Sequence, residues 1–222
     1  NHDVRSLSML TNLKNVSEFP VLSVNVCYKG TQTPYFSPYA IVTVNGKKVG
    51  IIGYTHDESA YMSDETAALI DVVPCVWDDN DSSTINIKDK VKELRETEGC
   101  DLVVLLAHIG HSRIVSGSDA LIADVGGVIP PEVVIAGHWH TWTQTAWQPS
   151  NLDGKTLVDE AASYMQYIGE LEVTGAGKYV QAQKHAIRTS EITPDVDVLN
   201  LISTLTAEYN SGNPPHALDE IV

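Results

Sequence analysis

The chain contains 222 residues, of which 43% are hydrophobic, and this is enough to form one substantial domain with its own core, or two small ones. The formal net charge of −15 argues against nucleic acid or an anionic membrane as the main partner. No apolar run approaches the roughly 20 residues that are needed to cross a bilayer, so no membrane span is predicted. The cysteines show no C-x-x-C spacing, which gives no metal signature and permits at most one disulfide with one free thiol.

The first part of the chain predicts a helix followed by strands. Leu7 to Leu13 has apolar residues at helical spacing, and Phe19 to Val26 alternates like a strand. Two further β-rich runs, Tyr39 to Val44 and Lys48 to Tyr54, are joined by Asn45-Gly46. Asn-Gly between two such runs is the strongest short signal for a β-hairpin, so a hairpin is expected here.

The middle of the chain predicts loops that lead into a parallel sheet. Thr55 to Asp81 is polar and acidic around one apolar patch, and we interpret it as surface loops with a short helix. Ile87 to Glu98 predicts an amphipathic helix that stops at Gly99. This helix leads into an apolar strand from Asp101 to Ala107, and a helix followed by a strand implies a crossover between parallel strands.

The last part predicts further strands and one more helix. A polar helix over Ser118 to Asp124 and a strand from Val133 precede segments that alternate like antiparallel strands. These segments are Trp142 to Trp147, Thr156 to Val158, Tyr167 to Val173 and Tyr179 to Ile187. Val196 to Tyr209 predicts a helix, and residues 210–222 have the composition of a linker. The elements together predict an α/β fold with mixed sheets and late antiparallel strands.

Two of the apolar strands end in glycine-linked histidine pairs. The strand from Val133 runs into His138 and His140, and the strand from Asp101 runs into His108 and His111. In extended backbone, side chains two residues apart leave from the same face, so His138 and His140 are expected to converge on one centre. Imidazole is a common metal ligand, and binding sites gather at the carboxyl ends of strands in α/β sheets. The two pairs therefore predict two edges of one metal site.

A structural explanation stays open for each of these residues. A lone histidine at a strand end is more often a hydrogen-bonded structural residue than a ligand, and it is the presence of two pairs that favours a metal. Asp57 and Glu58 also follow a strand and fit either a solvated loop or a part of the site. His56, His185 and His216 are given no role.

With both histidine pairs considered, the chain resembles the calcineurin-like metallophosphoesterases, and within them the secreted 5′-nucleotidase group. Asn1-His2-Asp3 is similar to the end of the family's G-N-H-[DE] motif, Ala107 to His111 to its sHxGh motif, and Gly137 to His140 to its G-H-x-H motif. Further segments resemble the family in the same order: Phe19 to Val26, Val44 to Gly53 and Glu160 to Glu170. The resemblance implies part of a β-sandwich flanked by helices, in α/β/β/α layers.

The resemblance also implies a site and a reaction. Asn1, His108 and His138 would ligate one metal ion and His140 another, while His2 would be the catalytic histidine that stabilises phosphoryl charge or protonates the leaving oxygen. The cofactors implied are two divalent metal ions, for which zinc, manganese, iron and calcium are candidates. The reaction implied is attack of a metal-activated hydroxide on a phosphate ester.

The chain departs from the family pattern in two ways, one of which concerns the expected domain organisation and the other the catalytic histidine. The family's Asp-x-His and Gly-Asp metal motifs lie upstream of G-N-H-[DE], so the chain is expected to be the C-terminal two-thirds of a catalytic domain. Residues 1–209 are predicted to form this catalytic domain without its upstream motifs, and residues 210–222 to link it to a C-terminal domain. Arg5 stands where the family's nucleotidases place an aspartate that orients the catalytic histidine.

Two functions follow from these expectations. The first is a 5′-nucleotidase-like, metal-dependent phosphoester hydrolase that acts on a phosphorylated small molecule such as a nucleotide. The alternative is a catalytically inactive structural or interaction fragment of such an enzyme, with at most one weak metal site. Absence of the upstream strands would expose a sheet edge for association with another chain. Glycosylation sequons at Asn15 and Asn80 favour a secreted or cell-surface glycoprotein.

Overall fold

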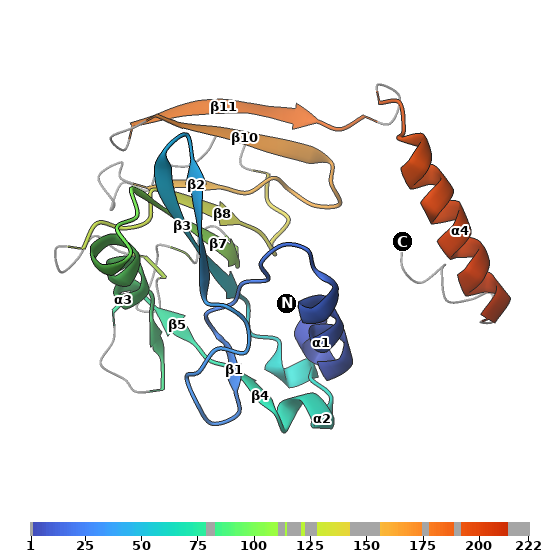
Figure 1. The fold of residues 1–222 in the computed structure, drawn as a ribbon, viewed down its shortest axis with the longest axis horizontal. Helices are drawn as coiled ribbons and strands as arrows, with labels where there is room; N and C mark the ends of the chain where they lie inside the picture. The colour runs from blue at the N-terminus through green and yellow to red at the C-terminus, as the bar shows by residue number, and fades with distance from the viewer. Residues whose placement is uncertain are drawn as a thin grey trace. The chain divides into compact units, whose positions relative to one another are not determined.

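A computed structural model describes residues 2–78, 83–110, 114, 121–122, 128–142, 156–174, 178–188 and 192–212 (Figure 1). The chain divides into two compact units, Asn1–His185 and Ala186–Val222, which are described separately. The first unit contains the sheets, and the second contains helix α4 (Val196–Gly212). Helix α4 confirms the helix predicted from Val196 and runs beyond Tyr209 into the start of the predicted linker. The predicted domain boundary at residues 209 and 210 stays a prediction.

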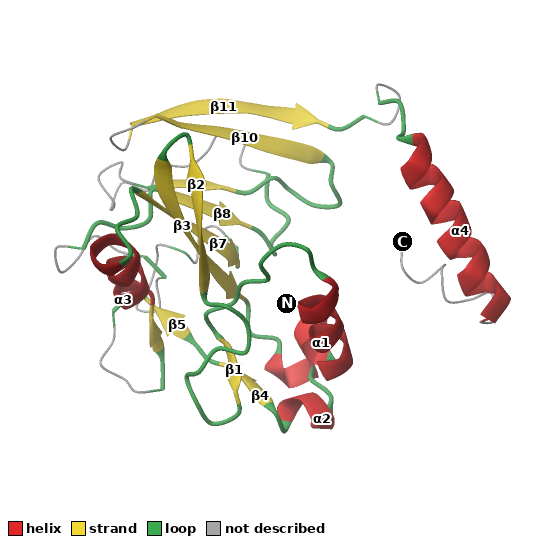
Figure 2. Cartoon of the chain, in the orientation of Figure 1, coloured by secondary structure: helices red, strands yellow, loops and turns green. Residues whose placement is uncertain are grey.

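A five-stranded mixed sheet forms the centre of the first unit (Figure 2). Its strand order is β2-β3-β7-β8-β9. The strands are β2 (Tyr39–Val44), β3 (Lys47–Thr55), β7 (Leu102–His108), β8 (Val133–Ala136) and β9 (Leu157–Asp159). Strand β2 is antiparallel to β3, and every other neighbouring pair is parallel. The predicted α/β class is therefore confirmed.

The predicted hairpin joins β2 to β3. Val44 pairs with Lys47, which leaves Asn45 and Gly46 as a two-residue turn. Both turn residues have positive φ, 50° for Asn45 and 76° for Gly46. A tight hairpin turn of this kind needs two left-handed residues, and Asn-Gly supplies them at the lowest steric cost.

A helical segment before β7 covers the sheet, as the amphipathic pattern predicts. Helix α3 (Ile87–Lys92) continues into a π-helical turn (Glu93–Thr97), and Gly99 follows with a φ of 68°. The side chain of Leu94 is fully buried over Gly50 of β3, where an added Cβ would stand 2.8 Å from Leu94 Cδ1. The glycine in β3 thus lets the helical segment approach the sheet closely.

The main hydrophobic core lies between this helical segment and the central sheet. Residues from β3, β7, β8 and β9 contribute to it, together with the segment before α3. Its most buried members include Ile52, Ile87, Val91, Leu94, Val103, Leu105, Ile114, Ile122, Val134 and Val158. Cys27, Cys75 and Cys100 also lie buried here as free thiols, and burial raises the pKa of the Cys27 thiol to about 11. These cysteines therefore act as small apolar core residues.

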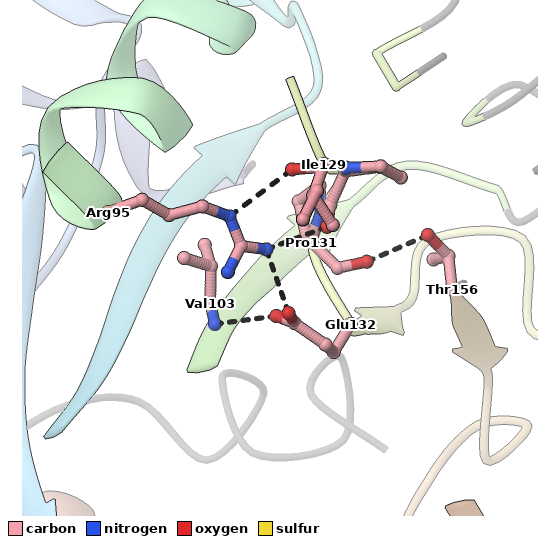
Figure 3. A network of polar contacts seen from close by, with 7 residues as sticks. Arg95, Val103, Ile129, Pro131, Glu132 and Thr156 are labelled. Carbon is pink, nitrogen blue, oxygen red and sulfur yellow. Dashed lines mark hydrogen bonds and ion pairs between the residues drawn. The ribbon is translucent and has the colours of Figure 1, made fainter. Parts of the chain in front are cut away.

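A polar network ties the amino ends of the parallel strands together (Figure 3). Arg95 Nη2 donates to Glu132 Oε1 at 2.9 Å and to the Pro130 carbonyl at 2.9 Å. The other carboxylate oxygen of Glu132 accepts from the Val103 N–H at 2.8 Å. Thr156 Oγ1 donates to the Pro131 carbonyl at 2.7 Å. The starts of β7, β8 and β9 are thus joined by buried polar groups that satisfy one another.

The N-terminal part begins with a one-turn 3-10 helix, η1 (His2–Arg5), and continues into helix α1 (Leu7–Val16), which confirms the predicted helix. The strand predicted over Phe19 to Val26 is wrong for most of its length, because only Val26 lies in a strand, β1 (Val26–Tyr28). The Ser23 N–H donates to the Ser37 carbonyl at 3.0 Å, whereas the next N–H, of Val24, donates to Gly53 at 2.8 Å. Successive backbone N–H groups thus donate to different segments of the chain, so the regular hydrogen-bond ladder of a β-strand does not form.

The prediction of surface loops over Thr55 to Asp81 is also wrong in its second half. After a short 3-10 turn, η2 (Ser59–Tyr61), and helix α2 (Asp64–Ala67), the chain forms strand β4 (Ile70–Val72), which is antiparallel to β1. Strand β5 (Cys75–Val76) follows and pairs in parallel with β6 (Ile85–Asn86). The apolar patch of this segment alternates inward, so it belongs to the core and not to the surface.

The late strands agree with the prediction in part. Strand β9 is parallel to β8, so the antiparallel pairing expected for Thr156 to Val158 is wrong. Strands β10 (Tyr167–Thr174) and β11 (Lys178–Ala186) form a separate two-stranded sheet, and the short connection between them requires an antiparallel pair. Most of the segments predicted over Ser118 to Asp124 and Trp142 to Trp147 lies outside the described residues.

Candidate active site

The carboxyl ends of three neighbouring parallel strands bring histidines together. Thr55 at the end of β3 pairs with His108 at the end of β7, and Ala107 pairs with Ala136 at the end of β8. His56 and His138 follow these strand ends directly or after one glycine. Since the strands run in the same direction and in this register, the three histidines meet at one edge of the sheet.

His108 and His138 lie next to each other, as the two histidine pairs predict. Their ring centroids are 5.3 Å apart and the ring planes cross at 72°. Gly137 makes this approach possible, because an added Cβ there would stand 3.0 Å from His108 Nδ1. A side chain at position 137 would require the His108 ring to move by a few tenths of an ångström.

The extended backbone on which the expected convergence of His138 and His140 rests is not present at either residue. Both residues have left-handed backbone, with φ values of 79° and 58°. The ring of His140 instead lies 5.3 Å from the ring of Tyr164, in the loop after β9. The chain turns sharply after Gly137, so the two-residue strand period does not apply here. His138 faces the His108 side of the edge, and His140 faces the loop after β9.

His56 is a site residue that the sequence reasoning missed. Its ring centroid lies 4.4 Å from that of His138, and its backbone N–H donates to the His108 carbonyl at 3.1 Å. Its Nδ1 accepts a hydrogen bond from the Asp57 N–H at 2.9 Å, which assigns the ring proton of the neutral imidazole to Nε2. The missed signal was its place directly after β3, the strand that pairs in parallel with β7.

The histidine cluster favours neutral imidazoles. Burial lowers the pKa of His108 to about 4, and the positive charge of the amino terminus, followed by the protonated forms of His138, His2 and His56, acts in the same direction. Burial also lowers the pKa of His138, and the nearby charge of His56 adds to this effect, while the Glu58 carboxylate opposes it. Neutral imidazoles have a free lone pair, which is the state in which histidine binds metal ions. The chemistry of this pair therefore fits nitrogen ligation of a divalent cation.

Other predicted site residues are placed less completely. His2 lies in η1, is exposed, and belongs to the groups whose charge acts on His108. Asn1 and His111 lie outside the described residues. Within the described part of the chain, no three histidine, cysteine, aspartate or glutamate side chains are grouped so that they could hold one metal ion. The structure thus brings together two of the predicted ligands, His108 and His138.

A buried asparagine supports the strand end beside the cluster. The side-chain amide of Asn25 donates to the Thr55 carbonyl at 2.9 Å, and its oxygen accepts from the Thr55 N–H at 3.1 Å. Asn25 is 1% exposed. The two bonds fix the backbone from which His56 follows.

An ion pair lies between η1 and the loop after β3. Arg5 Nη2 donates to Glu58 Oε2 at 2.7 Å, and the guanidinium carbon of Arg5 lies 4.9 Å above the centre of the Tyr61 ring. With 12% of its side chain exposed, Glu58 is not a solvated loop residue, and its carboxylate acts on the pKa of His138. Asp57 caps the following turn by accepting from the Ser59 N–H at 2.8 Å.

An open groove of about 450 Å³ lies beside His108 along the ends of β3, β7 and β8. It is lined by Pro20, Leu22, Gly53, Tyr54, Thr55, Leu106, Ala107, His108, Ile135, Ala136 and Gly137. Apart from His108 and Thr55, these side chains are apolar or aromatic. The carboxyl edge of the sheet, which carries His56, His108 and His138, thus borders a largely apolar surface.

Comparison with known proteins agrees with this fold. No protein-family model matches the chain. The chain is 32% identical over 202 residues to the snake venom 5′-nucleotidase of Naja atra, a match that covers 79% of this chain and 34% of that protein. It is 31% identical over 180 residues to the 5′-nucleotidase of Rattus norvegicus, which covers 72% of this chain and 28% of that protein.

Solved structures share the fold. The sulfate thiohydrolase SoxB of Thermus thermophilus matches with a TM-score of 0.69 and 19% identity, over 93% of this chain and 35% of that one. A 5′-nucleotidase precursor from the same organism matches with a TM-score of 0.60 and 24% identity, over 90% of this chain and 40% of that one. These likenesses define a metallophosphoesterase-type α/β fold.

The sequence relatives narrow this class. The chain belongs to the 5′-nucleotidase-like group of the calcineurin-like metallophosphoesterase superfamily, which confirms the resemblance seen in the sequence. It spans about a third of the length of the curated relatives that it matches, 34% of the Naja atra protein and 28% of the rat protein.

Proposed function

We propose that the protein containing this chain is a metal-dependent phosphoester hydrolase that acts on nucleotide 5′-phosphates. The observation that carries the proposal is the pair of neutral imidazoles, His108 and His138, 5.3 Å apart at the carboxyl edge of a parallel sheet. Sequence relatives named 5′-nucleotidases support the substrate class. The net charge of −15 disfavours an anionic substrate unless cations reverse the local field, and this also favours a metal-dependent site.

Two divalent metal ions are the proposed cofactors. Asn1, His108 and His138 would hold one and His140 the other, with further ligands from outside the described residues. When bound, such a pair of cations activates water as a nucleophile and offsets negative charge on the phosphate oxygens. The ring contact of His140 with Tyr164, beyond a turn with left-handed backbone, supports its assignment to a different ion, although its charge also acts on His138.

The chain's own residues have the following proposed roles. His2, on the exposed side of η1, donates a proton to the leaving oxygen or stabilises charge on the phosphoryl group. His56 keeps its Nδ1 engaged by the Asp57 N–H, so it presents an N–H donor and packs against His138.

The proposed location is extracellular or at the cell surface. Asn15, in the first sequon, is exposed on α1 and is therefore accessible to glycosylation, whereas Asn80 lies outside the described residues. None of the described helices combines the length and the apolar character that a membrane crossing requires. Association with another chain through an edge strand of the central sheet, β2 or β9, is part of the same proposal.

The test combines metal analysis with phosphate release. Protein purified without chelators should contain bound divalent metal by mass spectrometry and should release inorganic phosphate from adenosine 5′-monophosphate and from an aryl phosphate. Substitution His108→Ala removes a proposed ligand, so we expect kcat/KM to fall by at least about 100-fold, with a parallel loss of metal.

A histidine outside the site provides the control. His185, on β11, is exposed and lies 3.1 Å from Glu170, so His185→Ala should keep both metal content and turnover. If the unsubstituted protein holds no metal and shows no turnover, the non-catalytic role replaces the proposal. Turnover that survives His108→Ala would overturn the assigned site.

A further inference from the structure

The short helix that carries His2 also carries Arg5. Both residues belong to the single 3-10 turn η1, and between them Val4 is only 4% exposed. Val4 packs in the second hydrophobic cluster of the first unit, with Leu10, Val26, Phe36, Ile70 and Val72. One apolar anchor fixes the depth of a one-turn helix but not its rotation, so a second anchor is needed to set the direction of the His2 ring.

Arg5 supplies a second anchor through Glu58. The hydrogen bond from Arg5 Nη2 to Glu58 Oε2 is 2.7 Å long, which is typical of a charge-assisted bond. The Glu58 side chain is 12% exposed and that of Arg5 39%, so the carboxylate is largely shielded from water. The Tyr61 ring lies against the guanidinium at 4.9 Å and restricts it from another side. The pair is therefore better ordered than a surface ion pair.

The loop after β3, which contains Glu58, also contains His56 of the histidine cluster. Glu58 lies two residues after His56, whose ring contacts that of His138 at 4.4 Å. Further along the same segment, the Ser63 N–H donates to the Arg5 carbonyl at 3.0 Å. This segment thus connects η1 on one side with the proposed metal-binding edge on the other.

We infer that the Arg5–Glu58 ion pair positions His2 relative to His138, so that Arg5 and Glu58 are positioning residues of the phosphoesterase site. The inference rests on the proposed function, and it assigns no contact with substrate to either residue. It explains why a cation is tolerated three residues after His2: its charge is matched by Glu58, in the loop after β3. In this inference the imidazole is oriented through the backbone of η1.

A charge-exchange experiment tests this inference in the metal-loaded natural protein. Arg5→Glu and Glu58→Arg each place like charges together and should lower kcat about 10- to 100-fold, with KM and metal content nearly unchanged. The double variant R5E/E58R restores an ion pair, so its kcat should exceed that of either single variant by at least about 10-fold. The milder Glu58→Gln keeps a hydrogen-bond acceptor and should reduce kcat less than Glu58→Arg does.

The Lys29–Asp71 pair is the matched control. Lys29 Nζ lies 2.6 Å from Asp71, which sits in β4, and neither residue borders the histidines. The corresponding variants K29D, D71K and K29D/D71K should leave kcat per folded molecule unchanged. Unaltered kcat in Arg5→Glu and Glu58→Arg, loss of metal in step with activity, or no recovery in the double variant would overturn the inference.

A readout without turnover separates this inference from the proposed function. In metal-free protein with labelled histidine, the His2 ring signal in nuclear magnetic resonance should shift or broaden in Arg5→Glu and return in R5E/E58R. That result would support the positioning role even if the unsubstituted protein hydrolysed no phosphoester. A His2 signal that is the same in all three proteins would overturn the positioning role whatever the activity.

Discussion

The two ends of the central sheet use polar groups in opposite ways. At the amino end, Arg95, Glu132 and the Val103 N–H form bonds of 2.8 to 2.9 Å that satisfy one another (Figure 3). At the carboxyl end, His108 and His138 lie against each other, and each is affected by the positive charge of nearby groups. The first arrangement is complete without a ligand, whereas the second leaves imidazole lone pairs available.

This difference indicates where stability and function are divided in the fold. Polar groups that satisfy one another stabilise the folded state, because removal of one leaves its partner buried and unpaired. Neighbouring imidazoles disfavour each other's protonated form and lower the stability of the folded state. Such arrangements are retained where a bound ligand compensates for this cost. We therefore expect substitutions at the amino end to act on unfolding, and substitutions at the carboxyl end to act on metal binding and turnover.

The largest effect on stability is expected for Glu132→Ala. This change leaves the Arg95 guanidinium and the Val103 N–H without their carboxylate, at side-chain exposures of 17% for Arg95 and 11% for Glu132. Loss of one partner of such a buried pair costs about 3 kcal/mol of unfolding free energy. Urea unfolding followed by circular dichroism measures this cost, and kcat per folded molecule should stay the same.

An exposed ion pair near the start of β7 is the control for Glu132. Lys47 Nζ lies 2.9 Å from Asp101, and the Lys47 side chain is 64% exposed. Lys47→Met should change stability much less than Glu132→Ala, because exposed ion pairs contribute little. Equal losses in the two variants would mean that the Glu132 network has no special role in stability.

A pH effect is expected from the carboxyl end in metal-free protein. The pKa of His108 is lowered from 6.5 to about 4 in the folded state, so the unfolded chain takes up the proton first as the pH falls. Stability should thus be highest above pH 6.5, decrease between 6.5 and about 4, and then level off. Because His108 is exposed by its accessible surface, which weakens the effect of burial on its pKa, we expect a loss of about 1 kcal/mol and not the full value of the shift.

The two substitutions proposed for the activity test, His108→Ala and His185→Ala, also show whether His108 causes this pH dependence of stability. His108→Ala should flatten the change in urea midpoint between pH 6.5 and 4, whereas His185→Ala should keep it. A pH dependence that is unchanged in His108→Ala would show that other groups cause it.

The strands that build the histidine edge were predictable because their signals are local. Apolar runs mark β7 and β8, Asn45-Gly46 marks the hairpin before β3, and Gly137 marks the turn that follows β8. The segment over Phe19 to Val26 failed because its hydrogen bonds go to partners far along the chain, such as Ser37 and Gly53. A period-two pattern predicts an extended backbone but does not identify a neighbouring strand.

The role of His56 and the contact between Arg5 and Glu58 were not predicted, for a related reason. His56 carries no paired-histidine signal, and it reaches His138 only because β3 and β7 align Thr55 with His108. Glu58 and Arg5 are separated by 53 positions, and nothing in either local sequence indicates that they meet. Site residues that depend on strand register or on contacts between distant segments thus become visible only in the folded structure.

The smallest effect is expected where the carboxyl-end loops strain the backbone. Met165 has a φ of 54° and is 82% exposed, so it occupies left-handed backbone with little burial in return. Met165→Gly relieves this steric cost, part of which is offset by the greater freedom of glycine in the unfolded chain, for a net gain of about 0.5 kcal/mol. Met165→Ala keeps the Cβ and should give no gain by urea unfolding. If both variants gain equally, backbone strain does not explain the effect. A gain for glycine alone would mean that the loop beside His140 is held in this conformation at the expense of stability, as the comparison of the two sheet ends predicts.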